Sequence, residues 1–313
     1  MWFKNMQIFQ LEKPFTYDPS ALENELKQLI FQPCAKSLPV SFGWVPPLGD
    51  EQAPLVHAEN GHLIFCMQVE EKLLPPAILR SEHADRVKEI ETRQERKLYR
   101  DEKLRLKEEL YHTLLTRAFS KHQKVYAYID TKAGYLILDT TSKNRVEQFL
   151  GLFTKCVESY AIFSPEVTSP TTLMTRWLKD QVCPAGLTAA YNCALQNADN
   201  ELSTARFTHQ DLLGDGVQKF LRQGAQVTQM TFIWRDQIQF TLKNNFTIGG
   251  LKFLEGVQDQ RNDSMSETAE ERFATDFTIM AETFHHFLLE FIPACSMKAK
   301  SKALEEESAL AIA

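Results

Sequence analysis

Residues 124–140 read KVYAYIDTKAGYLILDT, and this stretch predicts the architecture of the first half of the chain. Its two ends, 124–130 and 135–140, are rich in the aromatic, β-branched and aliphatic residues that strands favour. Between them lies Thr131-Lys132-Ala133-Gly134, whose glycine can adopt the positive φ that a short turn requires. The stretch therefore predicts a β-hairpin.

The segments on either side of this hairpin alternate between strand and helix patterns. Residues 145–160 repeat apolar side chains at helical spacing, which predicts a helix that packs on the hairpin. Upstream, residues 3–10 and 62–69 are typical of strands, and residues 20–31 of a helix that opens with a Ser20–Glu23 capping box.

A charged segment separates the second of these strands from the hairpin. From Ser81 to Glu109 there are nine acidic and nine basic residues and no Gly or Pro. This composition predicts a long exposed helix or a helical pair. The apolar residues keep no strict heptad, so a projecting helical insertion is favoured over a coiled coil.

The pattern restarts after Pro165 and Pro170, which marks a domain boundary near residue 165. Three strand-like runs at 226–234, 237–243 and 246–254 predict a β-meander, and a capping box at Thr268-Ala269-Glu270-Glu271 begins a final helix. The fold class is therefore α+β, with mixed or antiparallel sheets. We expect a central domain (1–75 and 124–165), a helical insertion (76–123), a second α+β domain (166–300) and a frayed tail (301–313).

Composition places the chain among ordinary globular proteins. Hydrophobic residues make up 43% of the 313 residues and charged residues 24%. No apolar run approaches the roughly 20 residues of a membrane span, and no signal-peptide pattern is present, so we expect a cytoplasmic protein with reduced thiols. The net charge of −6 argues against a uniformly basic surface, although a nucleic-acid site needs only a local one.

Several short blocks along the chain together resemble a known family. They are MWFKN (1–5), FQPC (31–34), GWVPPLG (43–49), EEKLLP (70–75), RAFS (117–120), IDT (129–131), QDL (210–212), RDQIQF (235–240) and FATDF (273–277). In number and order these blocks are similar to the bacterial RdgC family over most of residues 1–290.

The resemblance implies a nucleoid-associated homodimer that closes into a ring around duplex DNA. Such a protein binds double- and single-stranded DNA with little sequence preference, restrains RecA-driven recombination and requires no cofactor. The chain departs from the family at His209, where relatives can carry lysine, and over residues 183–207. Whether that region contacts DNA stays open.

Sequence-independent DNA binding needs cations that meet phosphates. The candidate cations are Lys72, Arg80, Arg117, Lys121, Lys124, His209, Lys219, Arg222 and Lys243, and the neutral Gln210 is a further candidate for DNA contact. Of these, Arg117, Lys121 and Lys124 form a sequence cluster without a nearby acid. The alternative for each residue is a solvated surface charge.

Aromatic residues raise a similar choice. Phe119 lies in a polar, basic segment, so it either inserts into a pocket of a partner subunit or packs within its own chain. Trp44 and Trp177 have the neighbours of core residues, which disfavours a role in base stacking.

Enzyme motifs are missing from the sequence. It contains no GxxxxGK[ST], HExxH, GxSxG or GxGxxG pattern. The pairs His57 with His62 and Cys183 with Cys193 lack a second pair at zinc spacing, and the acidic residues of 259–271 fit a linker and a helix start better than a nuclease site. We therefore expect no enzyme and no metal. The alternative function is a protein–protein interaction module that acts through the 81–117 helices.

Overall fold

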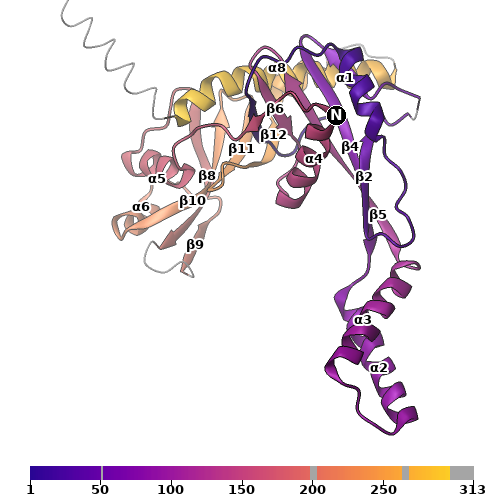
Figure 1. Cartoon of the computed structure of the whole chain (residues 1–313). Coiled ribbons are helices and arrows are strands. Elements are labelled where there is room, and N and C mark those ends of the chain that lie inside the picture. Colours follow the sequence, from indigo (N-terminus) through magenta and orange to yellow (C-terminus); the bar gives the residue numbers. More distant parts are fainter. Residues whose placement is uncertain (51, 198–202, 263–267, 297–313) are drawn as a thin grey trace, which may run out of the picture.

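The chain folds into an arch in the computed structural model, which describes residues 1–50, 52–197, 203–262 and 268–296. Two antiparallel sheets lie side by side beneath one long helix, α8, and a helical arm projects from the first sheet (Figure 1). This arrangement confirms the α+β class.

The first sheet comes from the N-terminal half of the described chain. Its strand order is β2-β4-β5-β6-β1-β7, and β3 pairs with the upper part of β4. The strands are β1 (Gln7–Leu11), β2 (Val40–Val45), β3 (Val56–Glu59), β4 (His62–Leu73), β5 (Phe119–Asp130), β6 (Tyr135–Leu138) and β7 (Ile162–Phe163).

The predicted hairpin is the β5–β6 pair, but β5 begins five residues earlier than predicted. Its first half pairs only with β4, in a register that runs from His62 opposite Asp130 to Leu73 opposite Phe119. Residues 120–124 are polar, so propensity gave no sign of a strand there. The result is a two-stranded ribbon that carries the arm.

Helices α1 (Pro19–Leu26), η1 (Lys27–Leu29) and α4 (Lys143–Cys156) lie on one face of the first sheet. Trp44 of β2 is fully buried there, with its ring edge-on to Phe65 and Phe149, so its assignment to the core is confirmed. The expected Ser20 cap is wrong. Asp18 caps α1 instead, because its carboxylate accepts the Ala21 N–H at 2.7 Å.

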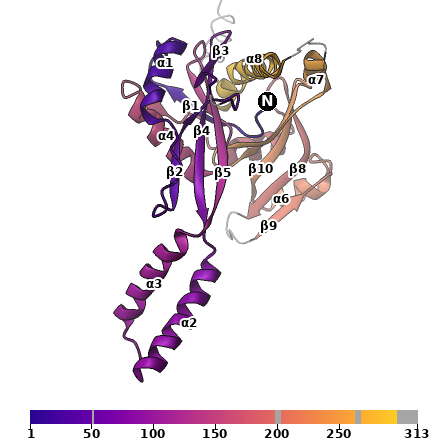
Figure 2. The same cartoon turned by 90° about the vertical axis from the view of Figure 1, so that its right-hand side faces the viewer.

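The arm is an antiparallel pair of helices, α2 (Pro76–Gln94) and α3 (Arg100–Leu115), which confirms the predicted helical insertion (Figure 2). Only Val87 and Leu115 are buried in these two helices. Ion pairs support the turn between them, where the pKa of the Glu91 carboxyl falls to about 2 because the Leu98 N–H and two lysines hold its charged form. The arm therefore has almost no core of its own.

The second sheet has the order β12-β11-β10-β8-β9 in the described chain, with antiparallel neighbours. Strands β10, β11 and β12, which are consecutive in the sequence, form the predicted meander. The elements are α5 (Pro170–Asp180), β8 (Leu187–Asn197), β9 (Thr204–Phe207), α6 (Asp215–Arg222), β10 (Ala225–Trp234), β11 (Ile238–Lys243), β12 (Ile248–Phe253) and α7 (Glu255–Asn262).

Helix α8 (Ala269–Cys295) joins the two sheets. Thr268 and Glu271 form the predicted capping box. Phe277 contacts Tyr128 of the first sheet, and Phe287 contacts Phe240 of the second. One hydrophobic core therefore lies between α8 and both sheets, across the expected domain boundary. None of the helices in the described part is long and apolar enough to cross a membrane.

Candidate nucleic-acid interface

One face of the second sheet carries helices and the other does not. Helices α5, α6 and α8 cover the first face, where Trp177 meets Phe232 and is confirmed as a core residue. The other face lies on the same side of the molecule as α4, inside the arch (Figures 1 and 2). We call it the open face. Its residues are Thr188, Ala194, Arg206, Gln229, Thr231, Ile233, Gln239, Thr241, Lys243 and Lys252.

Strand register brings distant residues of the open face together. Gln229 lies opposite Ala194 on one side and Lys243 on the other, and Ala194 lies opposite Arg206. This row therefore begins and ends with a cation. In a second row, Gln239 lies between Ile233 and Lys252. The hydroxyl oxygens of Thr231 and Thr241 are 3.0 Å apart between the two rows.

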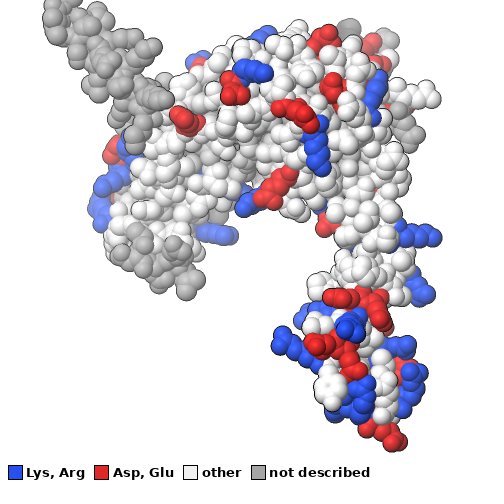
Figure 3. Space-filling model, viewed as in Figure 1, with Lys and Arg blue, Asp and Glu red and all other residues white. Residues whose placement is uncertain are grey.

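The charged residues of the second sheet are all of one sign. Throughout their described lengths, strands β8 to β12 contain no aspartate or glutamate, although the whole chain has 41 acidic and 35 basic residues. Arg206, Lys243 and Lys252 thus have no carboxylate neighbour on these strands. By contrast, Figure 3 shows that acidic and basic side chains are intermixed on the arm. The open face can therefore attract phosphates in a protein with net negative charge.

The structure separates the basic residues predicted in the second half. Lys243 lies on the open face, but Lys219 and Arg222 lie on α6, which covers the opposite face. His209 and Gln210 are exposed in the loop that follows β9. This loop is attached to β8, because the Gln210 N–H donates to the Tyr191 carbonyl at 3.2 Å.

The cluster expected at Arg117, Lys121 and Lys124 is not formed. All three residues are exposed, but Lys121 and Lys124 are three positions apart on β5 and so point to opposite faces of the ribbon. Lys121 also lies opposite Glu71, so the expectation of no nearby acid is wrong.

The two other predicted cations have local partners. Lys72 Nζ lies 4.0 Å from a Glu70 carboxylate oxygen. The pKa of Glu70 is lowered mainly because its carboxylate accepts the Cys34 N–H at 2.7 Å. Arg80 Nε donates to the Pro76 carbonyl oxygen at 3.2 Å.

Phe119 is at the root of the arm and is 85% exposed. Packing within its own chain is therefore wrong. Leu73, directly opposite on β4, is 49% exposed, so the two side chains form an apolar patch where the ribbon meets the arm. Such a patch is suited to contact with another protein surface.

Sequence reasoning missed Arg206 and Lys252. Both belong to strands, and their proximity to Lys243 depends on pairing between segments far apart in the sequence. A signal was nevertheless available, because the three runs of the predicted meander contain no acidic residue.

The acidic segment 259–271 gives no nuclease-like arrangement in its described part. Glu271 belongs to the capping box of α8, and its side chain accepts the N–H of the N-cap residue Thr268 at 3.1 Å. Asp263 and Glu267 lie outside the described residues.

The amino-acid sequence matches a known protein family. A family model described as "Putative exonuclease, RdgC" matches residues 1–296, which span the arm, both sheets and α8. The chain belongs to the RdgC family. Curated RdgC relatives align over nearly their whole length and carry the name "Recombination-associated protein RdgC".

The relatives come from several bacteria. The protein from Tolumonas auensis is 32% identical over 94% of this chain and 98% of its own length. That from Halorhodospira halophila is 33% identical over 90% and 93%, and that from Yersinia pestis 30% identical over 96% and 99%. The RdgC match thus includes the strands that build the open face.

Proposed function

We propose that this chain is a recombination-associated protein that binds DNA without reading its sequence, as a homodimeric ring around the duplex that limits RecA-promoted recombination. The recombination role rests on the names of its RdgC relatives. The DNA-binding role rests on one observation, the carboxylate-free open face on the inner side of the arch.

The chemistry of the open face fits a phosphate backbone better than base edges. Its Arg, Lys, Gln and Thr side chains donate hydrogen bonds to phosphate oxygens, and such contacts carry no sequence information. The open face also lacks the protruding helix that enters a major groove in sequence-reading proteins. Binding is therefore expected to be strong but indifferent to sequence.

The arm presents exposed apolar side chains that a second copy could cover. The apolar patch of Phe119 and Leu73 lies at the root of the arm, and the arm helices leave Ile78 and Leu104 about half exposed. Contacts that cover these residues in a second arch would close a ring with two open faces inside. The same exposed side chains favour the alternative, in which the arm docks a different protein and DNA binding is incidental.

The ring is tested by topology. After the solution mass has shown a dimer, binding is compared between linear DNA and a covalently closed circle of the same sequence. A closed ring has to open before it can load on the circle, so association should be slower there. Equal association rates on both forms would contradict encirclement, and a monomer that binds fully would contradict the dimer.

We also propose that the chain is not a nuclease, although the family description contains the word exonuclease. Support comes from the acidic segment, in which Glu271 already caps a helix. Incubation of end-labelled DNA with Mg²⁺ should leave the label intact. Release of mononucleotides by a highly purified protein would overturn this part of the proposal.

A further inference from the structure

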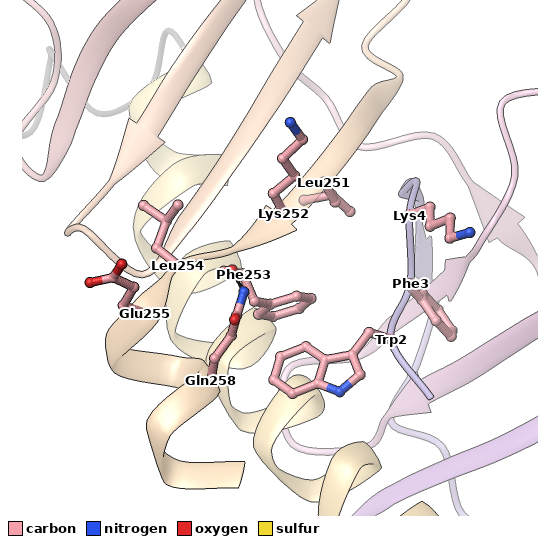
Figure 4. Close-up of a pocket in the computed structure, with 9 residues that line it drawn as sticks. All are labelled: Trp2, Phe3, Lys4, Leu251, Lys252, Phe253, Leu254, Glu255 and Gln258. Carbon is pink, nitrogen blue, oxygen red and sulfur yellow. Dashed lines mark hydrogen bonds between the residues drawn. The ribbon is translucent and has the colours of Figure 1, made fainter. Parts of the chain in front are cut away.

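A pocket of about 650 Å³ lies beside the open face, between the N-terminal segment and β12 (Figure 4). The segment is held in place because the Lys4 carbonyl accepts the Leu251 N–H at 2.9 Å, and because the Met1 ammonium pairs with Asp276. The volume is in the range of small-ligand sites. Its lining includes Trp2, Lys4, Lys252, Phe253 and Glu255.

The pocket combines an aromatic wall with two cations. The rings of Trp2 and Phe253 meet edge to face, with centroids 4.1 Å apart. Lys4 extends from the N-terminal segment, and Lys252 extends from β12 on the side of the strand opposite Phe253, whereas the Glu255 carboxylate points away from the rings (Figure 4). Both lysine side chains are exposed, and Lys252 also belongs to the open face.

We infer that this pocket binds an unpaired nucleotide of a DNA strand that lies on the open face. A base would stack on the partly exposed Trp2 ring, and the neighbouring phosphates would lie near Lys4 and Lys252. A paired base cannot enter, because its faces are already covered by its neighbours in the duplex. The inference rests on the proposed function and assigns the single-strand binding that the RdgC resemblance implies to one pocket.

Tryptophan fluorescence reports on this site selectively. The chain has four tryptophans, and Trp44, Trp177 and Trp234 are at most 5% exposed. A single-stranded 12-mer of mixed sequence should therefore quench Trp2, and the quenching should vanish in Trp2→Phe, which retains an aromatic ring beside Phe253. The matching duplex should quench much less.

Affinity measurements complete the test. Trp2→Ala should weaken single-strand binding by about fivefold to a hundredfold, as expected for the loss of one stacked base, and duplex binding by less than twofold. Lys4→Glu, an exposed change that leaves the ring contact alone, should also weaken single-strand binding. Phe163→Ala, at a 54% exposed aromatic on β7, is the control and should change neither affinity.

The outcomes separate the two proposals. Duplex binding together with no quenching of Trp2 by the single strand, or an equal loss of both affinities in Trp2→Ala, would overturn the pocket and leave the proposed function standing. Failure to bind either DNA would overturn the proposed function and the pocket with it. Loss of single-strand binding in both Trp2→Ala and Lys4→Glu, with duplex binding retained, supports the pocket.

Discussion

Arg206, Lys243 and Lys252 are individually ordinary surface cations, and their importance comes from their surroundings. They reach one face from three strands, and those strands carry no carboxylate that would neutralise them. Lys219 and Arg222 are also exposed but project from the helix on the other side of the sheet. The two sets therefore provide a matched comparison.

Replacement of the three open-face cations by alanine should reduce the salt dependence of DNA binding. Each lost phosphate contact removes about 0.9 from the slope of log K against log salt, so a dimer should lose up to about 5 units. Lys219→Ala combined with Arg222→Ala should leave the slope unchanged. The reverse pattern in salt titrations followed by fluorescence anisotropy would place the contact surface on α6.

His62 is fully buried beneath α8, and burial sets its titration. Its Nε2 lies 3.5 Å from a Glu282 oxygen and its Nδ1 3.9 Å from an Asp130 oxygen, and both carboxylates favour the charged ring. Desolvation is the largest effect and disfavours the charged ring, as do Lys132 and His285. The pKa of His62 is therefore lowered. The pKa of half-buried His57 is lowered mainly for the same reason.

These two histidines should make the fold less stable in mild acid. Because their pKa values are lower in the folded chain, the unfolded chain binds protons first as pH falls below about 6.5. Between the unfolded and the folded pKa, each histidine lowers the free energy of unfolding by at most about 1.4 kcal/mol per pH unit. Below the folded pKa the loss stops. Urea unfolding from pH 8 to 5 measures this slope, which should be shallower in His62→Gln. An unchanged slope in that variant would mean that His62 is not involved.

At the scale of elements, the sequence predicts best where one strand or helix shows its own pattern. The β5–β6 hairpin, the helical arm, the meander and the cap of α8 all carry local signals and were predicted. Strand β8 was missed because its alanines and asparagines have low strand propensity. It is held instead by pairing with β10. The open face was missed for a related reason, since register rather than local pattern creates it.

Gly43 shows how closely two elements approach. A Cβ atom at this position would lie 2.8 Å from the Ile30 carbonyl carbon and closer still to the Phe31 backbone. The contact is needed because the Phe31 N–H donates to the Trp44 carbonyl at 3.0 Å. Glycine is therefore required where β2 passes the backbone of Ile30 and Phe31, the two residues that follow η1.

Gly43→Ala should destabilise the fold by about 1–3 kcal/mol, the usual cost of overpacking. Gly151→Ala is the control, because Gly151 lies in α4 with nothing within 4 Å of an added Cβ. That change should stabilise the fold by about 0.5–1 kcal/mol. Both values come from urea unfolding, and equal effects of the two substitutions would contradict the close approach at Gly43.

At the scale of the whole molecule, Phe119 links the arm to assembly. Because the side chain is 85% exposed in the single chain, Phe119→Ala should change the free energy of unfolding of the monomer by less than about 0.5 kcal/mol. If the ring inserts into a partner subunit, dimer dissociation should become at least about 30-fold easier, the equivalent of about 2 kcal/mol. Sedimentation of this variant beside Phe163→Ala measures the difference. An unchanged dimer would remove Phe119 from the interface.

The inner side of the arch is the feature on which the proposed DNA binding depends. Its inner side presents cations and neutral donors without carboxylates on β8 to β12, so the molecule should hold any duplex and release it in salt.

The most direct test is the affinity of the intact protein for several unrelated duplexes over a range of salt concentrations. We expect affinities within about threefold of one another, all falling along the same steep line as salt rises. One duplex bound about a hundredfold more tightly than the others, or binding that does not change with salt, would contradict DNA recognition by the open face.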